Sequence, residues 1–165
     1  MMISKNLLDG KKVLIVDDEP EVLETLEDFL SMSDITKASS FDEAKELLKN
    51  QDFDLAILDI MGVDGYRLLE IANERKVIAI ILTAHALSVR NTIKAYQEGA
   101  ASYVPKDEMA NIHVYLNDIL EAREKGKSFW WRWRERFGSY YDKKFGAEWK
   151  EKEKGAEFWE KICYW

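Results

Sequence analysis

The stretch Leu55-Ala56-Ile57-Leu58-Asp59-Ile60-Met61-Gly62 decides how the rest of this 165-residue chain is interpreted. Four consecutive apolar residues that end at an acidic one predict a strand buried on both faces, with Asp59 at the point where the strand leaves the sheet. An aspartate there either opens a turn or takes part in chemistry. The other predicted strands help to decide between these two interpretations.

Polar residues follow nearly every apolar segment of the chain. Five segments are typical of buried or half-buried strands: residues 12–16, 35–38, 55–58, 77–82 and 101–104. Four of them lead into a charged or hydroxyl residue, namely Asp17 and Asp18, Asp59, Thr83, and Lys106 after Pro105. Each of these residues alone is explained by a turn, a helix cap or a solvated surface. Their recurrence at strand ends favours a shared site.

Amphipathic segments separate the predicted strands. Pro20 begins one helix, and Ser40 with Glu43 forms a capping box at the start of the next. Gly99 stands at a helix C-cap, and residues 108–125 predict a longer last helix. Strand and helix alternate five times, which predicts an α/β fold with a parallel sheet and helices on both faces. In such sheets ligands bind at the carboxyl ends of the strands.

The residues at these strand ends indicate phosphoryl chemistry. Carboxylates that lie close together repel one another unless a cation shares the site, and oxygen ligands favour a hard ion such as Mg²⁺. Thr83 and Lys106 would surround an anion beside Asp59. The pattern therefore predicts that the Asp59 carboxylate attacks a phosphoryl group to give an aspartyl phosphate, which water later removes.

Asp17-Asp18, Asp59, Thr83-Ala84 and Lys106, in this order and with these separations, resemble the receiver domain of two-component response regulators. The resemblance implies a five-stranded sheet of order 2-1-3-4-5, as in flavodoxin-like folds. It also implies that a sensor histidine kinase or a phosphotransfer protein supplies the phosphoryl group. On this basis the chain is expected to be a switch in a phosphorelay and not an enzyme in the usual sense.

The same resemblance assigns a role to each site residue. Asp59 is the phosphoacceptor, Asp18 binds Mg²⁺ directly, and Asp17 binds it mostly through water. The backbone carbonyl of Met61 supplies a further ligand, Thr83 and Lys106 contact the phosphoryl group, and Tyr103 matches the aromatic residue that changes rotamer in the switch. Two features depart from the family pattern: the loop after Asp59 is shorter and lacks a proline, and Pro105 precedes Lys106 where a proline commonly follows the lysine.

Composition excludes several other classes of protein. The net charge of -7 and the pI near 5.0 argue against direct DNA binding, which needs a basic face. A single cysteine and two histidines disfavour a zinc site. The N-terminus lacks the apolar run of a signal peptide, so a cytoplasmic location is expected.

The composition changes in the last part of the chain. All six tryptophans lie within the last 36 residues. Aromatic residues there recur at helical spacing, which predicts a short helical C-terminal extension. We therefore divide the chain into a receiver domain, residues 1–126, and an aromatic helical tail, residues 127–165. The tail could pack on the receiver, dock a downstream protein or a second copy of the chain as a homodimer, or, least favoured, lie on a membrane surface.

Two other functions compete with the phosphorylatable receiver. A degenerate receiver could act as a structural adaptor whose acidic site no longer reacts. A Mg²⁺-dependent phosphatase-like α/β enzyme is the second alternative, but no glycine-rich phosphate loop follows the first strand. Metal titration separates the receiver from the adaptor, because an adaptor should be indifferent to Mg²⁺ with a phosphoryl mimic such as beryllofluoride.

Overall fold

The computed structural model describes residues 6–84 and 89–126. Strands and helices alternate along these residues, in the order β1 (Lys12–Val16), α1 (Pro20–Phe29), β2 (Asp34–Ala38), α2 (Phe41–Asn50), β3 (Leu55–Asp59), α3 (Gly65–Glu74), β4 (Ile78–Thr83), α4 (Val89–Gln97), β5 (Ser102–Pro105), the 3-10 helix η1 (Lys106–Asn111) and α5 (Ile112–Glu124). The expected aromatic tail and its helical extension lie outside the described residues, so that part of the sequence analysis stays a prediction.

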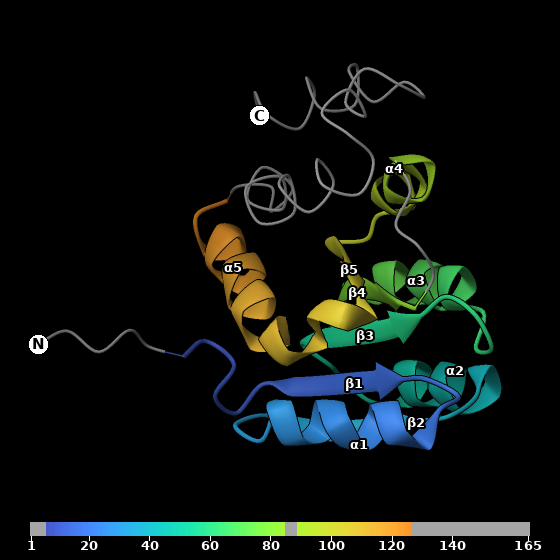
Figure 1. The fold of residues 1–165 in the computed structure, drawn as a ribbon, viewed down its shortest axis with the longest axis horizontal. Coiled ribbons are helices and arrows are strands. Elements are labelled where there is room, and N and C mark those ends of the chain that lie inside the picture. Colours follow the sequence, from blue (N-terminus) through green and yellow to red (C-terminus); the bar gives the residue numbers. More distant parts are fainter. Residues whose placement is uncertain (1–5, 85–88, 127–165) are drawn as a thin grey trace, which may run out of the picture.

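The five strands form one parallel sheet in the order β2-β1-β3-β4-β5. Helices α1 and α5 cover one face of this sheet, and α2, α3 and α4 cover the other (Figure 1). The predicted α/β fold and its 2-1-3-4-5 strand order are therefore confirmed. The order changes direction between β1 and β3, where open parallel sheets form binding crevices at the carboxyl ends of their strands.

Strand register brings the polar strand ends into line. Val16 pairs with Leu58, so Asp17 and Asp59 follow neighbouring positions of β1 and β3. Asp59 in turn pairs with Leu82 of β4. Thr83 then pairs with Pro105, the residue before Lys106. Parallel pairing thus carries the four strand ends to one edge of the sheet.

The central strands form the core. Every residue of β3 is buried, and β4 is buried from Ala79 to Thr83. These strands read as continuous apolar runs because helices cover both faces of the sheet. Burial of each large aliphatic side chain contributes about 1.5–3 kcal/mol before conformational entropy is subtracted. The packed core therefore fixes the positions of the strand ends that carry the polar residues.

Two helix ends are formed as their sequence predicts. The Ser40 hydroxyl accepts a hydrogen bond from the Glu43 backbone N–H at 3.2 Å, which caps α2. Gly99, with φ +90°, ends the helical region after α4, and the Ala100 N–H donates to the Ala95 carbonyl at 2.9 Å. A glycine is favoured at this left-handed position because it has no Cβ.

The prediction of one continuous helix over residues 108–125 is wrong at its start. Residues 106–111 form the tighter 3-10 helix η1, and the α-helix begins only at Ile112. Glu108 accounts for the difference, because its carboxylate accepts hydrogen bonds from Asn111 Nδ2 at 3.1 Å and from the Tyr115 hydroxyl at 2.7 Å. These contacts join the 3-10 helix to the first turn of α5.

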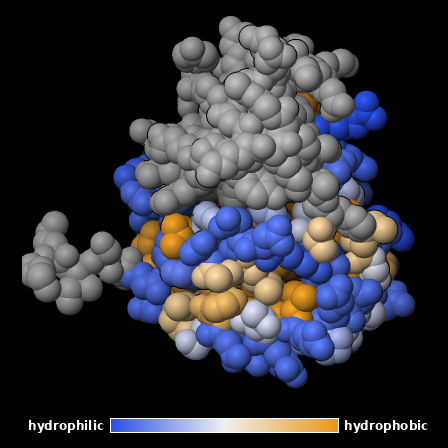
Figure 2. Space-filling view, in the orientation of Figure 1, coloured by the Kyte–Doolittle hydropathy of each residue, from blue (hydrophilic) through white to orange (hydrophobic). Residues whose placement is uncertain are grey.

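The described surface is that expected of amphipathic helices. In the coloured part of Figure 2, hydrophilic side chains predominate and apolar patches lie between them. Among the described residues, the large apolar side chains exposed to solvent are those of Phe29 and Met61. No helix in this part of the chain is long and apolar enough to span a membrane.

Candidate functional site

Asp17 and Asp18 leave β1 at the carboxyl edge of the sheet but differ in exposure. Asp17 is buried, whereas Asp18 is exposed. The Glu19 backbone N–H donates to Asp17 Oδ1 at 2.9 Å, which fixes the orientation of that carboxylate. Each of Asp17, Asp18 and Glu19 can bring a carboxylate oxygen within 4.8 Å of the other two. The end of β1 therefore presents three acids to one small volume.

Asp59 ends β3 beside this acidic group. It is only 6% exposed. Burial, followed by the negative charge of Asp17, raises the pKa of the Asp59 carboxyl from 3.8 to about 6, although the positive charge of Lys106 opposes the shift. The carboxylate of Asp59 is thus poorly solvated, and it would gain much from a cation placed next to it.

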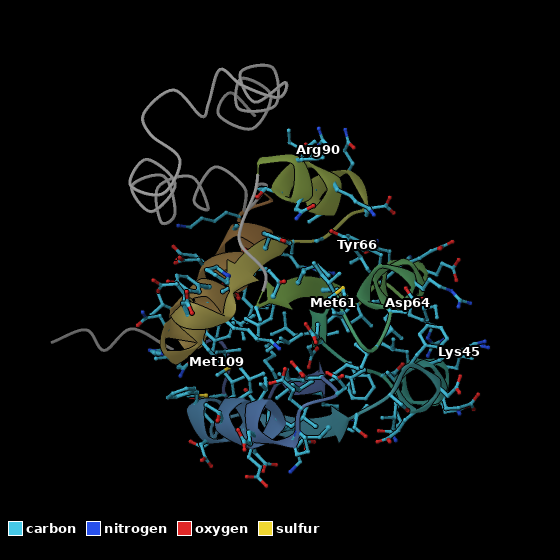
Figure 3. All side chains as sticks on the ribbon, turned by 45° about the vertical axis from the view of Figure 1, so that its right-hand side comes forward. Lys45, Met61, Asp64, Tyr66, Arg90 and Met109 are labelled. Carbon is cyan, nitrogen blue, oxygen red and sulfur yellow. The ribbon has the colours of Figure 1, made fainter. Side chains whose placement is uncertain are left out.

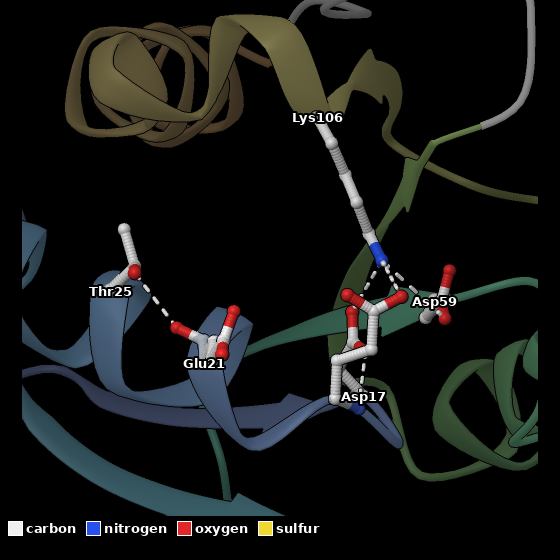
Figure 4. Close-up of polar contacts among 6 residues, drawn as sticks. Asp17, Glu21, Thr25, Asp59 and Lys106 are labelled. Atoms are coloured by element: carbon white, nitrogen blue, oxygen red, sulfur yellow. Dashed lines mark hydrogen bonds and ion pairs between the residues drawn. The ribbon is translucent and has the colours of Figure 1, made fainter.

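Lys106 reaches this acidic cluster from the far end of β5. Its Nζ lies 2.9 Å from Asp17 Oδ2, 3.7 Å from Asp59 Oδ2 and 3.9 Å from Glu19 Oε1 (Figure 4). Burial lowers the pKa of the Lys106 ammonium, but its hydrogen bond to Asp17 and the surrounding carboxylates outweigh that effect and raise the pKa. The lysine is therefore charged when it lies among the carboxylates.

Thr83 and Tyr103 lie on the neighbouring strands β4 and β5, beside the group of charged residues. Both are buried, Thr83 at the end of β4 and Tyr103 in the middle of β5. Burial and then the nearby phenol of Tyr66 raise the pKa of Tyr103 to about 12, while hydrogen bonding with Thr83 and Asn91 acts in the opposite direction. Tyr103 is therefore turned inward, in contact with the residue at the end of β4.

The loop after Asp59 passes very close to the site. A Cβ on Gly62 would overlap the Asp18 carboxylate, and a Cβ on Gly65 would overlap the backbone carbonyl of Asp59. Gly62 also has φ +83°, which favours glycine. Met61 directly precedes Gly62 and is 56% exposed (Figure 3). The role of its backbone carbonyl as a metal ligand stays a prediction.

The structure brings together most of the residues that the sequence singles out. Asp17, Asp59 and Lys106 form one ion-paired group, Asp18 belongs to the acidic cluster, and Thr83 and Tyr103 contact each other beside it. Sequence reasoning missed Glu19 as a third acid of the cluster. Sequence reasoning also missed that Gly62 and Gly65 lie against Asp18 and Asp59. The only signal that could have suggested this is the place of both glycines in a short loop.

The acidic group has the donor set of a site for a hard divalent cation. Its potential ligands are carboxylate oxygens, and nitrogen or sulfur donors are absent from the cluster. Burial, and after it the charges of Asp17 and Asp18, raise the pKa of Asp59. A cation at this point would favour the ionised carboxylate and offset these effects, so the residues present fit Mg²⁺.

Comparison with known proteins identifies the family. The family model of the response regulator receiver domain matches residues 13–117. Response regulator GtcR of Aneurinibacillus migulanus is 40% identical over 125 residues, which cover 70% of this chain and 51% of that protein. Two-component response regulator ARR18 of Arabidopsis thaliana is 35% identical over 122 residues, which cover 67% of this chain and 19% of that protein.

Solved structures share the same fold. A CheY-like receiver domain protein from Methanospirillum hungatei JF-1 superimposes with a TM-score of 0.63 at 27% identity, covering 71% of this chain and 98% of that one. The receiver domain of the Francisella response regulator 1452 gives a TM-score of 0.61 at 26% identity, covering 68% of this chain and 98% of that one.

The fold and the acidic strand ends define a receiver domain. The chain belongs to the response regulator receiver family of two-component systems. It spans about half the length of GtcR and a smaller part of ARR18. Receiver domains act as signalling switches, and they bind Mg²⁺ at an acidic pocket and interact with histidine kinases or phosphotransfer proteins.

Proposed function

We propose that this chain is a phosphorylatable receiver that accepts a phosphoryl group on Asp59. The observation that carries this proposal is the position of the Asp59 carboxylate, which lies 3.7 Å from the Lys106 ammonium and beside the acids at the end of β1. A nucleophilic carboxylate next to a fixed cation and a potential metal site is the arrangement that phosphoryl transfer requires.

In the proposed reaction an oxygen of Asp59 forms a bond to phosphorus while the bond from phosphorus to a histidine nitrogen of the donor breaks. The donor is a phosphohistidine on a sensor histidine kinase or phosphotransfer protein. Lys106 moves its charge from Asp17 toward the new phosphoryl oxygens, and the Thr83 hydroxyl donates a hydrogen bond to another. Water later hydrolyses the aspartyl phosphate, so the chain is a switch and not a metabolic enzyme.

Asp18, Asp59 and the backbone carbonyl of Met61 would hold Mg²⁺, with Asp17 acting mostly through water. The ion, when bound, neutralises negative charge that develops on the phosphoryl oxygens. The close approach of Gly62 to Asp18 supports this assignment, because it keeps the loop that carries Met61 against the acidic cluster.

Phosphorylation would be reported through Thr83 and Tyr103. Because the side chains of Thr83 and Tyr103 interact, a movement of Thr83 toward a phosphoryl group changes the contacts of a fully buried ring. A buried aromatic residue has few alternative positions, so such a change biases the surface formed by α4, β5 and α5 between two states.

We infer that the output is protein contact. Residues 1–126 would form the receiver and residues 127–165 a tail that docks on the receiver, on a downstream protein or on a second copy of the chain. The acidic composition disfavours direct DNA binding and membrane attachment, and a cytoplasmic location fits a partner of sensor kinases.

Intact-mass measurement tests this function directly. The full chain is incubated with Mg²⁺ and a small acyl phosphate, alongside Asp59→Asn and the matched variant Asp64→Asn, which changes an exposed carboxylate in the following loop. We expect one added phosphoryl group on the wild type and on Asp64→Asn, and none on Asp59→Asn. No addition to the wild type would favour the structural adaptor, and continuous release of phosphate with no phosphorylated chain would favour a phosphatase-like enzyme.

A further inference from the structure

A basic groove lies between α2 and α3, on the sheet face opposite α1 and α5. Its volume is about 320 Å³, and it is lined by Lys45 and Lys49 of α2, by Arg67, Glu70, Ile71 and Glu74 of α3, and by Arg75 at the end of α3. None of these residues belongs to the phosphorylation site. The proposed function therefore gives this groove no role.

Two arginines of the α3 segment fix the ends of the groove against α2. The guanidinium of Arg67 lies over the ring of Phe41, 4.6 Å from its centroid, at the first residue of α2. Arg75 Nε donates to the Leu48 carbonyl at 3.0 Å, near the last residue of α2. Both ends of α2 are thus tied to α3, so the groove has rigid walls.

The positive charges in this groove are weakly compensated. Arg67 lies 3.7 Å from Asp64, and Arg75 lies 3.5 Å from Asp52, a carboxylate whose side chain is 98% exposed. Such exposed pairs contribute little free energy. Lys45 and Lys49 make no ion pair with any described residue. The lining itself carries four cations and two carboxylates, and Asp64 and Asp52 each pair with one of the arginines from outside it, although the chain as a whole has a net charge of -7.

The spacing of the charges matches a helix. Lys45 and Lys49 are one helical turn apart on α2 (Lys45 is labelled in Figure 3), and Glu70 and Glu74 are one turn apart on α3. The half-buried Ile71 lies on the α3 side of the groove. An incoming segment therefore meets the two lysines of α2, an apolar contact at Ile71 and, on α3, two glutamates that stand between Arg67 and Arg75 along the chain.

We propose that the α2–α3 groove docks an acidic helical segment of a partner protein. The segment places two acidic side chains, one turn apart, against Lys45 and Lys49, and an apolar side chain against Ile71. Glu70 and Glu74, which stand between Arg67 and Arg75 along α3, disfavour acids at the middle of that edge, so the acidic side chains of the segment face α2. This interaction goes beyond the proposed phosphorylation and requires no phosphate on Asp59.

Amide chemical-shift mapping tests the groove on the full, unphosphorylated chain. The probe is a short synthetic helical peptide that carries two glutamates one turn apart with a leucine between them. A second peptide of the same composition carries the glutamates on opposite faces. The groove variant is Lys45→Glu with Lys49→Glu, and Lys11→Glu with Lys12→Glu makes the same change of net charge elsewhere. A Lys45→Gln and Lys49→Gln variant removes the charges without reversing them.

We expect the shifts caused by the first peptide to concentrate on α2 and α3. Its dissociation constant should rise roughly tenfold or more in the charge-reversed groove variant, by less in the glutamine variant, and by less than about threefold in the Lys11 and Lys12 control. The proposal is overturned if both charge-reversed variants lose affinity equally, if the two peptides bind equally well, or if the shifts lie elsewhere. It is also overturned if wild type binds phosphatidylserine vesicles through Lys45 and Lys49 while the peptide does not bind.

Discussion

The ammonium of Lys106 lies 2.9 Å from Oδ2 of Asp17. This contact is shorter than the 3.7 Å that separates the same Nζ from Asp59 Oδ2. The lysine thus compensates the buried acid of the proposed metal site more directly than it compensates the phosphoacceptor. A cation bound among these acids would therefore compete with Lys106 for the same carboxylates.

Replacement of Lys106 by Met should strengthen Mg²⁺ binding by roughly three- to tenfold, because it removes a competing positive charge from Asp17 and Asp59. Isothermal titration calorimetry without a phosphodonor measures this affinity. Lys37→Met is the control, since it loses the same charge from an exposed ion pair with Glu27. An unchanged or weaker affinity in Lys106→Met would show that the lysine and the cation do not compete.

Asp59→Asn should stabilise the metal-free protein at about pH 8. Burial and Asp17 raise the pKa of Asp59 to about 6 from 3.8. The folded state therefore favours the protonated form of Asp59. The resulting contribution to the free energy of unfolding is fully present below the pKa that Asp59 has in the unfolded chain, and it is lost as the pH rises through about 6. At about pH 8 the variant should gain about 1–3 kcal/mol in free energy of unfolding, because it carries no buried charge.

Urea denaturation with a chelator, at about pH 8 and at about pH 5, measures this difference. We expect the difference in free energy of unfolding between Asp59→Asn and wild type to decrease as the pH falls. Asp52→Asn should show no such dependence, because the side chain of Asp52 is 98% exposed. An equal difference in free energy of unfolding at both pH values would mean that the buried charge of Asp59 does not cause that difference.

The sequence predicted the sheet and the composition of its polar edge for a simple physical reason. Buried parallel strands must be continuously apolar, so polar residues such as Asp17, Asp59 and Thr83 mark where each strand ends. Parallel register then brings those ends together, independently of the conformation of the loops between the strands. The strand-end positions could thus be predicted from one-dimensional patterns.

Other features depend on contacts that the sequence does not encode locally. The 3-10 start of α5 follows from the hydrogen bonds that Glu108 accepts from Asn111 and Tyr115. The basic groove depends on Arg67 reaching Phe41 of a neighbouring helix. Helical spacing alone predicts neither, because each depends on which side chains meet after the chain has folded.

Ser102→Ala should raise the free energy of unfolding by up to about 1 kcal/mol. The hydroxyl of Ser102 is fully buried and finds no hydrogen-bond partner among the described residues. Its desolvation therefore costs free energy that no hydrogen bond offsets. Ser40→Ala is the matched change, and it should lower the free energy of unfolding by about 1 kcal/mol because it removes the cap of α2. Chemical denaturation of both variants is the measurement, and destabilisation by Ser102→Ala would reveal an interaction of that hydroxyl.

Gly62→Ala should weaken Mg²⁺ binding, whereas Gly10→Ala should not. Both glycines have positive φ angles, +83° for Gly62 and +74° for Gly10, so both substitutions strain the backbone and should cost about 1–2 kcal/mol of stability. They differ in their surroundings: a Cβ at Gly10 meets nothing within 4 Å, but a Cβ at Gly62 overlaps the Asp18 carboxylate. Only Gly62→Ala therefore has to push Asp18 out of the acidic cluster.

Calorimetric titration of the two variants separates backbone strain from displacement of this proposed ligand. We expect the Mg²⁺ affinity of Gly62→Ala to fall by roughly tenfold, which corresponds to about 1.4 kcal/mol, while Gly10→Ala keeps the wild-type affinity. Thermal melts should show similar losses of stability in both, because the strain is common to them. If Gly62→Ala bound Mg²⁺ as tightly as Gly10→Ala, Asp18 would not be a direct ligand, and the proposed metal site would have to be assigned without that carboxylate.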